Sequence, residues 1–332
     1  MRILVTGATG LLGPHLCRRL VEDGHEVTIL RRPTSNVTQL ANLNLRHEVG
    51  DITNVEDVLR ATSDQDAVIH AAAHTAYFGA SAEEQNRVNI EGTGNVVRAC
   101  RAQRNTRLLH VSSVATIGIP AGPRKPADEN FVFNLEGSGL TYHISKRRAE
   151  EEVLEAKGLD AVVVNPALIW GSNGDTYRGN EVFEKILRYP VIPHGPGGQC
   201  IVHVSDVVDG IVRALEEGRA GERYILGGDN VSFGELNRTI CRQLGLTRLL
   251  IPIPASAAEF GNRVKNVVRR ILGAKPLPTY NRSFCYPFYS SAKAKAQLGY
   301  NPRPIGSLVQ EAAAYVGRTI SDAGRAEQSA TG

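Results

Sequence analysis

Tyr142 and Lys146 are the residues of this sequence whose types and spacing first suggest chemistry, because they lie four positions apart in Thr141-Tyr142-His143-Ile144-Ser145-Lys146. In a helix this spacing places both side chains on one face, one turn apart. A phenol has a pKa near ~10, and a neighbouring ammonium lowers it, so that the tyrosine can exchange a proton with a substrate oxygen. Such pairs are also common on solvated helix faces, so the pair needs a second signal before it indicates a catalytic site.

A glycine-rich turn near the N-terminus supplies that signal. Residues 2–5 are typical of a buried strand, and glycines follow at every third position, at Gly7, Gly10 and Gly13. Gly7 permits a tight turn, Gly10 lets backbone N–H groups approach a pyrophosphate, and Gly13 allows a helix to pack closely on the strand. The pattern predicts a Rossmann-type dinucleotide site, with cofactor contacts from Gly7, Thr9, Gly10, Leu11, Leu12 and Gly13.

The end of the second predicted strand, 27–30, indicates which dinucleotide binds. NAD sites usually carry an acidic residue there, to bond the ribose 2′-hydroxyl. Here Arg31 and Arg32 follow Leu30. Because two guanidinium groups suit a 2′-phosphate and offer nothing to a diol, we predict a preference for NADP(H) over NAD(H).

Strands and helices alternate through the first half of the chain, which predicts a doubly wound α/β fold with a parallel sheet. The expected strands are 2–5, 27–30, 45–49, 67–70, 107–112 and 160–164, and the expected helices are 12–23, 55–62, 83–103 and 142–157. After Pro166 the rhythm loosens into a smaller α+β substrate domain, with a helix at 206–217 returning to the sheet. We predict a cofactor domain of 1–166 and 199–222, a substrate domain of 167–198 and 223–318, and a disordered tail of 319–332.

The composition narrows the class of protein. The 332 residues are 42% hydrophobic and 22% charged, with a net charge of +4 and no block of like charges, so nucleic-acid binding is not indicated. No apolar run approaches ~18 residues, and the chain begins with a strand instead of a signal peptide, so we expect a cytoplasmic protein without membrane insertion. The five cysteines lie far apart without metal-ligand spacing and are typical of free thiols. A helix with a basic face is expected at 255–272, capping the substrate cleft.

The chain as a whole resembles the extended short-chain dehydrogenase/reductase superfamily. Besides the glycine turn and Tyr142-x-x-x-Lys146, the motifs that carry the resemblance follow one another in the family's order. They are Gly50-Asp51-Ile52, His70-Ala71-Ala72-Ala73, Asn89-Ile90-Glu91-Gly92-Thr93, Val111-Ser112-Ser113 with Gly118, Pro166 through Gly171, and His203-Val204-Ser205-Asp206-Val207-Val208.

The resemblance implies roles for individual residues. The catalytic hydroxyl lies five residues before Gly118, which selects Ser113, with Ser112 as the fallback; Tyr142 and Lys146 complete the catalytic set. Further cofactor contacts are implied for Asp51, Ile52, Ala71, Ala72, Ala73, Asn89, Ser112, Pro166 and Leu168. Read as residues alone, Asp51 is equally suited to capping the helix that begins near Asn54, Asn89 to bonding backbone, and His70 to packing at a strand end.

Within the superfamily the chain looks most like the dihydroflavonol-4-reductase and 3β-hydroxysteroid dehydrogenase branch, as Arg31-Arg32, Ser112 to Thr116, Val164-Asn165-Pro166 and Gly221 to Gly228 indicate. This implies an NADP(H)-dependent oxidoreductase that interconverts a carbonyl and an alcohol on a small apolar or aromatic substrate, as a monomer or homodimer. The expected substrate contacts are His74, Tyr77, Phe78, Val114, Asn165, Trp170 and Tyr177.

Two alternatives remain open. A nucleotide-sugar epimerase or dehydratase uses the same serine, tyrosine and lysine, but such enzymes commonly place an arginine four residues before the histidine of His-Val-x-Asp. Here Gln199 occupies that position, and a diphosphate would lose a bidentate partner, although Arg178, Arg188, Arg282 or Arg303 could substitute. The second alternative is a non-catalytic NADP-binding regulator, which the intact set of Ser113, Tyr142 and Lys146 argues against.

Overall fold

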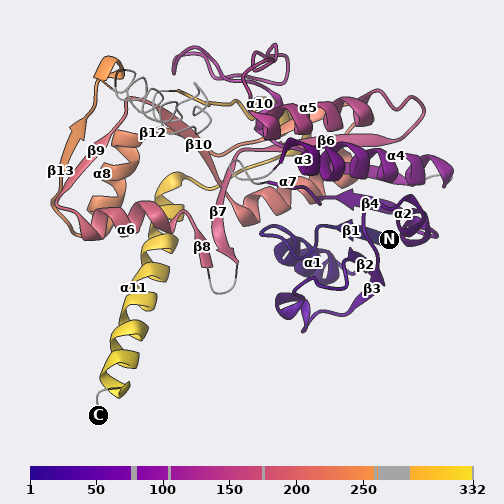
Figure 1. The fold of residues 1–332 in the computed structure, drawn as a ribbon, viewed down its shortest axis with the longest axis horizontal. Coiled ribbons are helices and arrows are strands. Elements are labelled where there is room, and N and C mark those ends of the chain that lie inside the picture. Colours follow the sequence, from indigo (N-terminus) through magenta and orange to yellow (C-terminus); the bar gives the residue numbers. More distant parts are fainter. Residues whose placement is uncertain (76–80, 104–105, 174–175, 258–259, 261–284, 331–332) are drawn as a thin grey trace.

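Seven parallel strands form the central sheet of the computed structural model, which describes residues 1–75, 81–103, 106–173, 176–257, 260 and 285–330. The strand order is β11-β6-β5-β4-β1-β2-β3 (Figure 1). Their bounds are β1 Arg2–Thr6, β2 Glu26–Arg31, β3 Leu45–Val49, β4 Ala67–His70, β5 Arg107–Val111, β6 Ala161–Pro166 and β11 Arg223–Leu226. The order reverses direction between β1 and β4, and this doubly wound topology confirms the predicted fold class.

Helices cover both faces of this sheet. Strand β1 shows the division, because the side chains of Ile3 and Val5 belong to one buried cluster and that of Leu4 to another. Helices α1 (Gly13–Glu22) and α7 (Val204–Glu217) close the first cluster, while α2 (Val55–Thr62), α4 (Gly92–Ala102) and α5 (Thr141–Leu154) close the second. The sheet is therefore buried on both faces and presents its strand ends to ligands.

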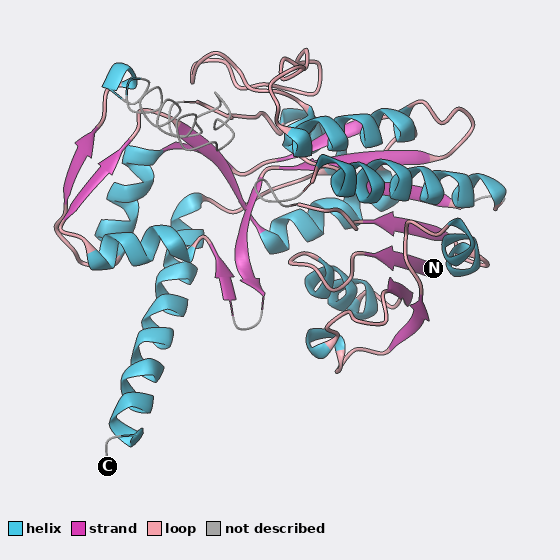
Figure 2. Cartoon of the chain, viewed as in Figure 1, coloured by secondary structure: helices cyan, strands magenta, loops and turns pink. Residues whose placement is uncertain are grey.

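A second, smaller region lies beside the carboxyl ends of the central strands (Figure 2). Its four-stranded sheet has the order β12-β10-β7-β8, and β13 pairs with β9 beside it. The elements are β7 Leu168–Asn173, β8 Thr176–Arg178, α6 Asn180–Arg188, β9 Val191–His194, β10 Gly198–His203, β12 Asp229–Ser232, α8 Phe233–Gln243, β13 Leu249–Pro252, α10 Ala292–Leu298 and α11 Ile305–Ala330. A separate buried cluster built on Trp170, Tyr177 and Phe183 holds this region together.

The strands expected for the first half match β1 to β6 within two residues at each end. The helix expected at 83–103 is interrupted, because α3 (Ala82–Asn86) and α4 are joined by a π-helical turn at Arg87–Glu91. Such turns are frequent at functional sites. Asn89 lies within this one.

Two expectations for the second half need correction. Strand β10 belongs to the smaller sheet, whereas β11 joins the central sheet by pairing with β6, because Tyr224, Ile225 and Leu226 are all fully buried there. Helix α11 extends to Ala330 and so runs through most of the tail expected to be disordered (Figure 1). The sequence after Pro304 contains no further proline to stop it. Most of the basic segment 255–272 lies outside the described residues.

Within the described part of the chain, none of the helices combines the length and apolarity needed to cross a bilayer.

Candidate active site

A cavity of about 560 Å³ opens where the carboxyl ends of β1 to β6 face the smaller region. Parallel sheets bind ligands at this edge because the turns that leave the strands converge there. Twenty of the residues singled out in the sequence line it. They are Gly7, Thr9, Gly10, Leu11, Leu12, Arg31, Arg32, Asp51, Ile52, Ala71, Ala72, Ala73, His74, Ser112, Ser113, Val114, Tyr142, Lys146, Pro166 and Leu168.

The glycine turn has the shape that a dinucleotide pyrophosphate needs. Gly7 has a φ of 76°, and a Cβ there would lie 2.5 Å from the backbone nitrogen of Ala72. A Cβ on Gly13 would lie 2.2 Å from the carbonyl oxygen of Ala8, so α1 packs too closely for any side chain. At Gly10 a Cβ would meet only the carbonyl oxygen of Gly7, at 3.4 Å, so this glycine leaves the cavity open. No side chain caps α1 at Leu12, and its first N–H groups are available to an anion.

At the end of β2, Arg31 and Arg32 form one rim of the cavity together with Ser35. The Nε of Arg31 donates to Nδ1 of His47 at 3.1 Å, and its Nη1 donates to the carbonyl oxygen of Arg32 at 3.4 Å. The backbone nitrogen of Ser35 also donates to that carbonyl oxygen, at 3.1 Å. These bonds curl the turn so that two cations and a hydroxyl border the same space.

Asp51 is not the cap of α2. Its Oδ1 accepts from the backbone nitrogen and the hydroxyl of Thr53, both at 2.9 Å, and the side chain of Asn54 caps the helix instead. Asp51 and Ile52 both reach the cavity.

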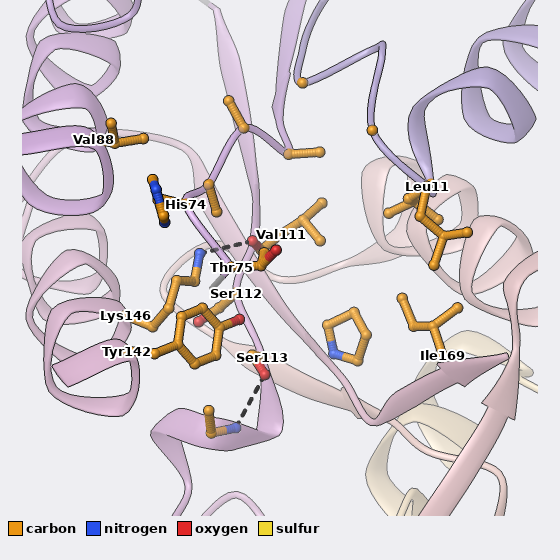
Figure 3. A pocket seen from close by; sticks show the side chains of 18 of the residues that line it. Leu11, His74, Thr75, Val88, Val111, Ser112, Ser113, Tyr142, Lys146 and Ile169 are labelled. Carbon is orange, nitrogen blue, oxygen red and sulfur yellow. Dashed lines mark hydrogen bonds between the residues drawn. The ribbon is translucent and has the colours of Figure 1, made fainter. Parts of the chain in front are cut away.

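Tyr142 and Lys146 lie in the first two turns of α5 and project toward the strand end that carries Ser112 and Ser113 (Figure 3). The Nζ of Lys146 donates to the carbonyl oxygen of Val111 at 3.1 Å and to Nε2 of His110 at 3.4 Å. Burial lowers the pKa of the Lys146 ammonium to about 8, and the nearby carboxylate of Glu150 opposes this shift. Lys146 is thus a buried cation that is fixed in position by neutral acceptors.

Behind Lys146 lies a pair of buried histidines. The rings of His70 and His110 are 5.2 Å apart, and both side chains are fully buried. The two ring nitrogens of His70 bond the hydroxyls of Thr6 at 2.7 Å and Thr93 at 3.0 Å. Burial, with the charge of Lys146, lowers the pKa of His70 to about 3 and that of His110 well below its usual value. Both imidazoles are therefore neutral, and His70 packs at the strand end, away from the cavity.

Ser113 caps a short 3₁₀ turn, Val114–Thr116, and the buried carboxylate of Glu150 supports this turn through hydrogen bonds. Its Oγ accepts from the backbone nitrogen of Ala115 at 3.1 Å (Figure 3). Its carbonyl oxygen accepts from the amide of Asn165 at 3.2 Å and from the hydroxyl of Thr116 at 2.9 Å. Both of these donors also bond Oε2 of the fully buried Glu150, at 2.6 and 2.7 Å. The other oxygen of Glu150 accepts from Nη1 of Arg223 at 2.9 Å, which compensates its charge.

This arrangement corrects the substrate role expected for Asn165, Trp170 and Tyr177. Asn165 is fully buried in the network behind Ser113. Trp170 packs against Phe183 with ring centroids 6.2 Å apart, and Tyr177 is 1% exposed in the same cluster. In β8, strand alternation explains the difference between neighbours, because Tyr177 faces the buried cluster and Arg178 the opposite side. Ile169 and Arg178 take the cavity side instead.

Asn89 and Gly13 also lie outside the cavity lining. The Oδ1 of Asn89 accepts from the backbone nitrogen of His74 at 2.7 Å, and its Nδ2 donates to the carbonyl oxygen of His74 and to the hydroxyl of Ser145. Asn89 thus joins the segment after β4 to the catalytic helix and positions both. Tyr77 and Phe78, expected at the substrate, lie outside the described residues.

Comparison with known proteins agrees with this geometry. The sequence profile of the NAD-dependent epimerase/dehydratase family matches residues 3–227, well over half of the chain. The chain belongs to this family. A 3-beta-hydroxysteroid dehydrogenase from Mycolicibacterium neoaurum is 30% identical, in an alignment that spans 91% of this chain and 87% of that protein. A dihydroflavonol 4-reductase-like protein from Synechocystis is also 30% identical, over 93% of this chain and 92% of its own.

A solved structure extends the likeness to three dimensions. The crystal structure of gox2253 superposes with a TM-score of 0.82 at 33% identity, covering 96% of this chain and 98% of that chain. The family match and the named relatives together identify this chain as an extended short-chain dehydrogenase/reductase, which is an NAD(P)-dependent oxidoreductase.

Several lining residues of this oxidoreductase carry no motif, and sequence reasoning did not assign them to the site. Ser35, Ile119, Pro287 and Tyr289 reach the cavity from loops and from the far end of the chain. The hydroxyl of Tyr289 donates to the carbonyl oxygen of Gly118 at 2.9 Å, which fixes that wall.

Proposed function

We propose that this oxidoreductase uses NADPH to reduce the ketone or aldehyde of a small, apolar or aromatic compound, or catalyses the reverse reaction. The observation that carries the proposal is that Ser113, Tyr142 and Lys146 line one cavity with the glycine turn. The same cavity has apolar lining residues beside these polar ones, among them Val114, Ile119, Ile169 and Pro287. An apolar wall with a few converging polar groups is typical of a small-molecule site.

Three side chains divide the work on the substrate oxygen. A bound nicotinamide cofactor supplies or accepts the hydride. Tyr142 donates its proton to the oxygen as negative charge develops, and the hydroxyl of Ser113 donates a hydrogen bond to the same oxygen. An ammonium has three N–H donors, and Val111 and His110 occupy two of them on Lys146. The third is left for the cofactor ribose, and the positive charge of the ammonium lies one helical turn from the phenol of Tyr142.

The preference for NADPH rests on the rim formed by Arg31, Arg32 and Ser35. A ribose 2′-phosphate would meet two guanidinium groups and a hydroxyl there, in a form that the ribose diol of NADH lacks. Asp51 and Ile52, beyond the end of β3, would border the adenine.

The principal alternative is a nucleotide-sugar epimerase or dehydratase. Gln199 lines the cavity at the position where those enzymes commonly carry an arginine. A carboxamide gives a substrate diphosphate neither charge nor a bidentate fork, so a diphosphate would have to use Arg178, which also lines the cavity. A non-catalytic regulator would have no use for Tyr142 and Ser113 placed beside one cavity. We also propose that the protein is cytoplasmic, which its five free cysteines support, and that it acts as a monomer or homodimer.

The test is a panel of aliphatic, aromatic, steroidal and polyketide-like carbonyl compounds, scored by NADPH oxidation, with uridine, guanosine and thymidine diphosphate sugars assayed in parallel. We expect turnover of at least one apolar carbonyl compound and no binding of the nucleotide sugars by calorimetry. Micromolar binding of a nucleotide sugar, with product formed at constant NADPH, would favour the epimerase instead.

A further inference from the structure

Arg178 is a cavity residue whose charge has no partner among the residues that the structure describes. It lies at the end of β8, where it pairs with Gly171 of β7. Its neighbour Tyr177 points into the buried cluster, so the Arg178 side chain takes the opposite, cavity-facing side of the strand. The next residue, Gly179, has a φ of 109°, and a Cβ there would lie 2.7 Å from the Trp170 ring. This close packing fixes the turn that follows Arg178.

Arg32, another cation of the cavity lining, belongs to the rim proposed for the 2′-phosphate, and the remaining three cations have partners in the protein. Arg31 bonds His47, Lys146 bonds Val111, and Nη1 of Arg87 donates to the hydroxyl of Thr53 at 3.3 Å. Among the described residues, neither a hydrogen bond nor an ion pair engages the guanidinium of Arg178. Its five N–H donors remain available to a ligand.

The hairpin that carries Arg178 is attached to the helix that begins at the glycine turn. Nε2 of His15, in the first turn of α1, lies 2.7 Å from the carbonyl oxygen of Ser172 in β7 and bonds to it. Ile169 of β7 lies on the same side of the cavity as Leu11, opposite Tyr142 and Lys146 (Figure 3). Arg178 is thereby held on the wall that adjoins the glycine turn and the uncapped start of α1.

The start of α1 carries a partial positive charge from the helix dipole. A guanidinium on the adjoining wall adds a second positive charge, and no acidic side chain in the described part of the chain pairs with it. The Arg178 side chain is exposed, so it is accessible to an anion bound at the start of α1. Phosphate oxygens match a guanidinium fork bidentately.

We propose that Arg178 binds the cofactor's pyrophosphate from the side opposite the glycine turn, so that the smaller region contributes directly to cofactor affinity. The inference rests on the assignment as an NAD(P)-dependent oxidoreductase. It does not require the NADPH preference or the carbonyl substrate, because NADH and NADPH carry the same pyrophosphate.

The experiment titrates four ligands against Arg178→Met by fluorescence or calorimetry: NADPH, NADH, ADP-ribose and adenosine 2′,5′-bisphosphate. Hydrogen bonds to charged groups contribute about 1.5–3 kcal/mol, so the dissociation constants of the first three should rise roughly 10- to 100-fold and by similar factors. Adenosine 2′,5′-bisphosphate keeps only the adenosine-side phosphate of the pyrophosphate and should lose less affinity than the other three ligands. Arg178→Lys, which keeps the charge but loses the fork, should give an intermediate loss.

Arg188→Met is the matched control, because Arg188 is an exposed arginine of α6 that contacts the ring of Tyr189 and lies outside the cavity lining. It should leave all four dissociation constants unchanged. Unchanged NADPH and NADH binding in a folded Arg178→Met protein would overturn the proposal. It would equally be overturned if only the KM of carboxylate-bearing substrates rose, since Arg178 would then bind the substrate. These are binding measurements, so a wrong carbonyl substrate cannot mimic either outcome.

Discussion

The two walls of the cavity are built in different ways. On the α5 side, Lys146 and the turn of Ser113 are backed by a buried polar network that includes His110, Glu150 and Asn165. On the other side lie the apolar residues Leu11 and Ile169, together with Arg178, whose charge has no partner in the described part of the chain (Figure 3). The buried network behind the first wall positions the catalytic side chains without itself contacting the substrate. Residues of the second wall can be replaced without disturbing this network, and this separation lets one fold serve many substrates.

The largest effect should come from the group that transfers the proton. Tyr142→Phe removes only the hydroxyl, so turnover should fall by at least about 10²–10⁴-fold, the usual contribution of a positioned acid. Cofactor binding should remain nearly intact. Steady-state kinetics and fluorescence titration measure the two quantities. Retention of most of the wild-type rate would exclude Tyr142 as the acid.

Glu150→Gln tests whether the buried network supports the Ser113 turn. Removing the charge leaves Arg223 without its counter-ion, and breaking a buried pair typically costs about 3–5 kcal/mol of unfolding free energy, of which we expect the lower end because Arg223 is partly exposed. Turnover per folded molecule should also fall, since the charged acceptor shared by Thr116 and Asn165 is replaced by a weaker, neutral amide oxygen. Urea unfolding and kcat are the measurements.

The control on the same helix is Glu151→Gln. Glu151 pairs with Arg147 but is 43% exposed, and such pairs contribute at most about 1 kcal/mol. If both variants lost the same stability, the buried network would have no special role.

Replacing Arg31 and Arg32 together with alanine tests the rim beside β2. The loss of two phosphate partners should weaken NADPH binding about 10- to 100-fold while changing NADH binding little. The measurement is the ratio of the two dissociation constants. This ratio should change in the double variant but not in Arg178→Met, which should weaken the binding of both cofactors alike. The difference would assign Arg31 and Arg32 to the 2′-phosphate and Arg178 to the pyrophosphate. An unchanged ratio would refute the 2′-phosphate site.

A smaller effect should appear in the pH dependence of cofactor binding. The Lys146 ammonium has a pKa of about 8, so it is charged below that pH and neutral above it. NADPH affinity should therefore decline as the pH rises through this value. Because Glu150 raises the pKa of Lys146, Glu150→Gln should shift the decline to lower pH. A decline unaffected by both Glu150→Gln and Lys146→Met would have another origin.

The two walls also differ in what the sequence reveals. Gly7 and Gly13 must be glycines because a Cβ would lie too close to neighbouring backbone, and Gly10 keeps the ligand space open. Tyr142 and Lys146 are related by one helical turn. Local spacing in the sequence therefore predicts all five residues. Trp170 and Tyr177 were assigned to the substrate from residue type alone. Their burial depends on which face of β7 and β8 meets α6 and α11, and local sequence does not contain that packing. Tyr289 reaches the cavity by a pairing across more than half of the chain.

The account's central claim is net reduction of a carbonyl at the Ser113, Tyr142 and Lys146 site. The most direct measurement uses NADPH deuterated at C4 of the nicotinamide, with the best compound from the carbonyl panel, and follows product mass and NADPH consumption together. The account predicts one deuterium at the former carbonyl carbon and one NADPH oxidised for each alcohol formed, both abolished in Tyr142→Phe. Product formed without deuterium and without net loss of NADPH would contradict it.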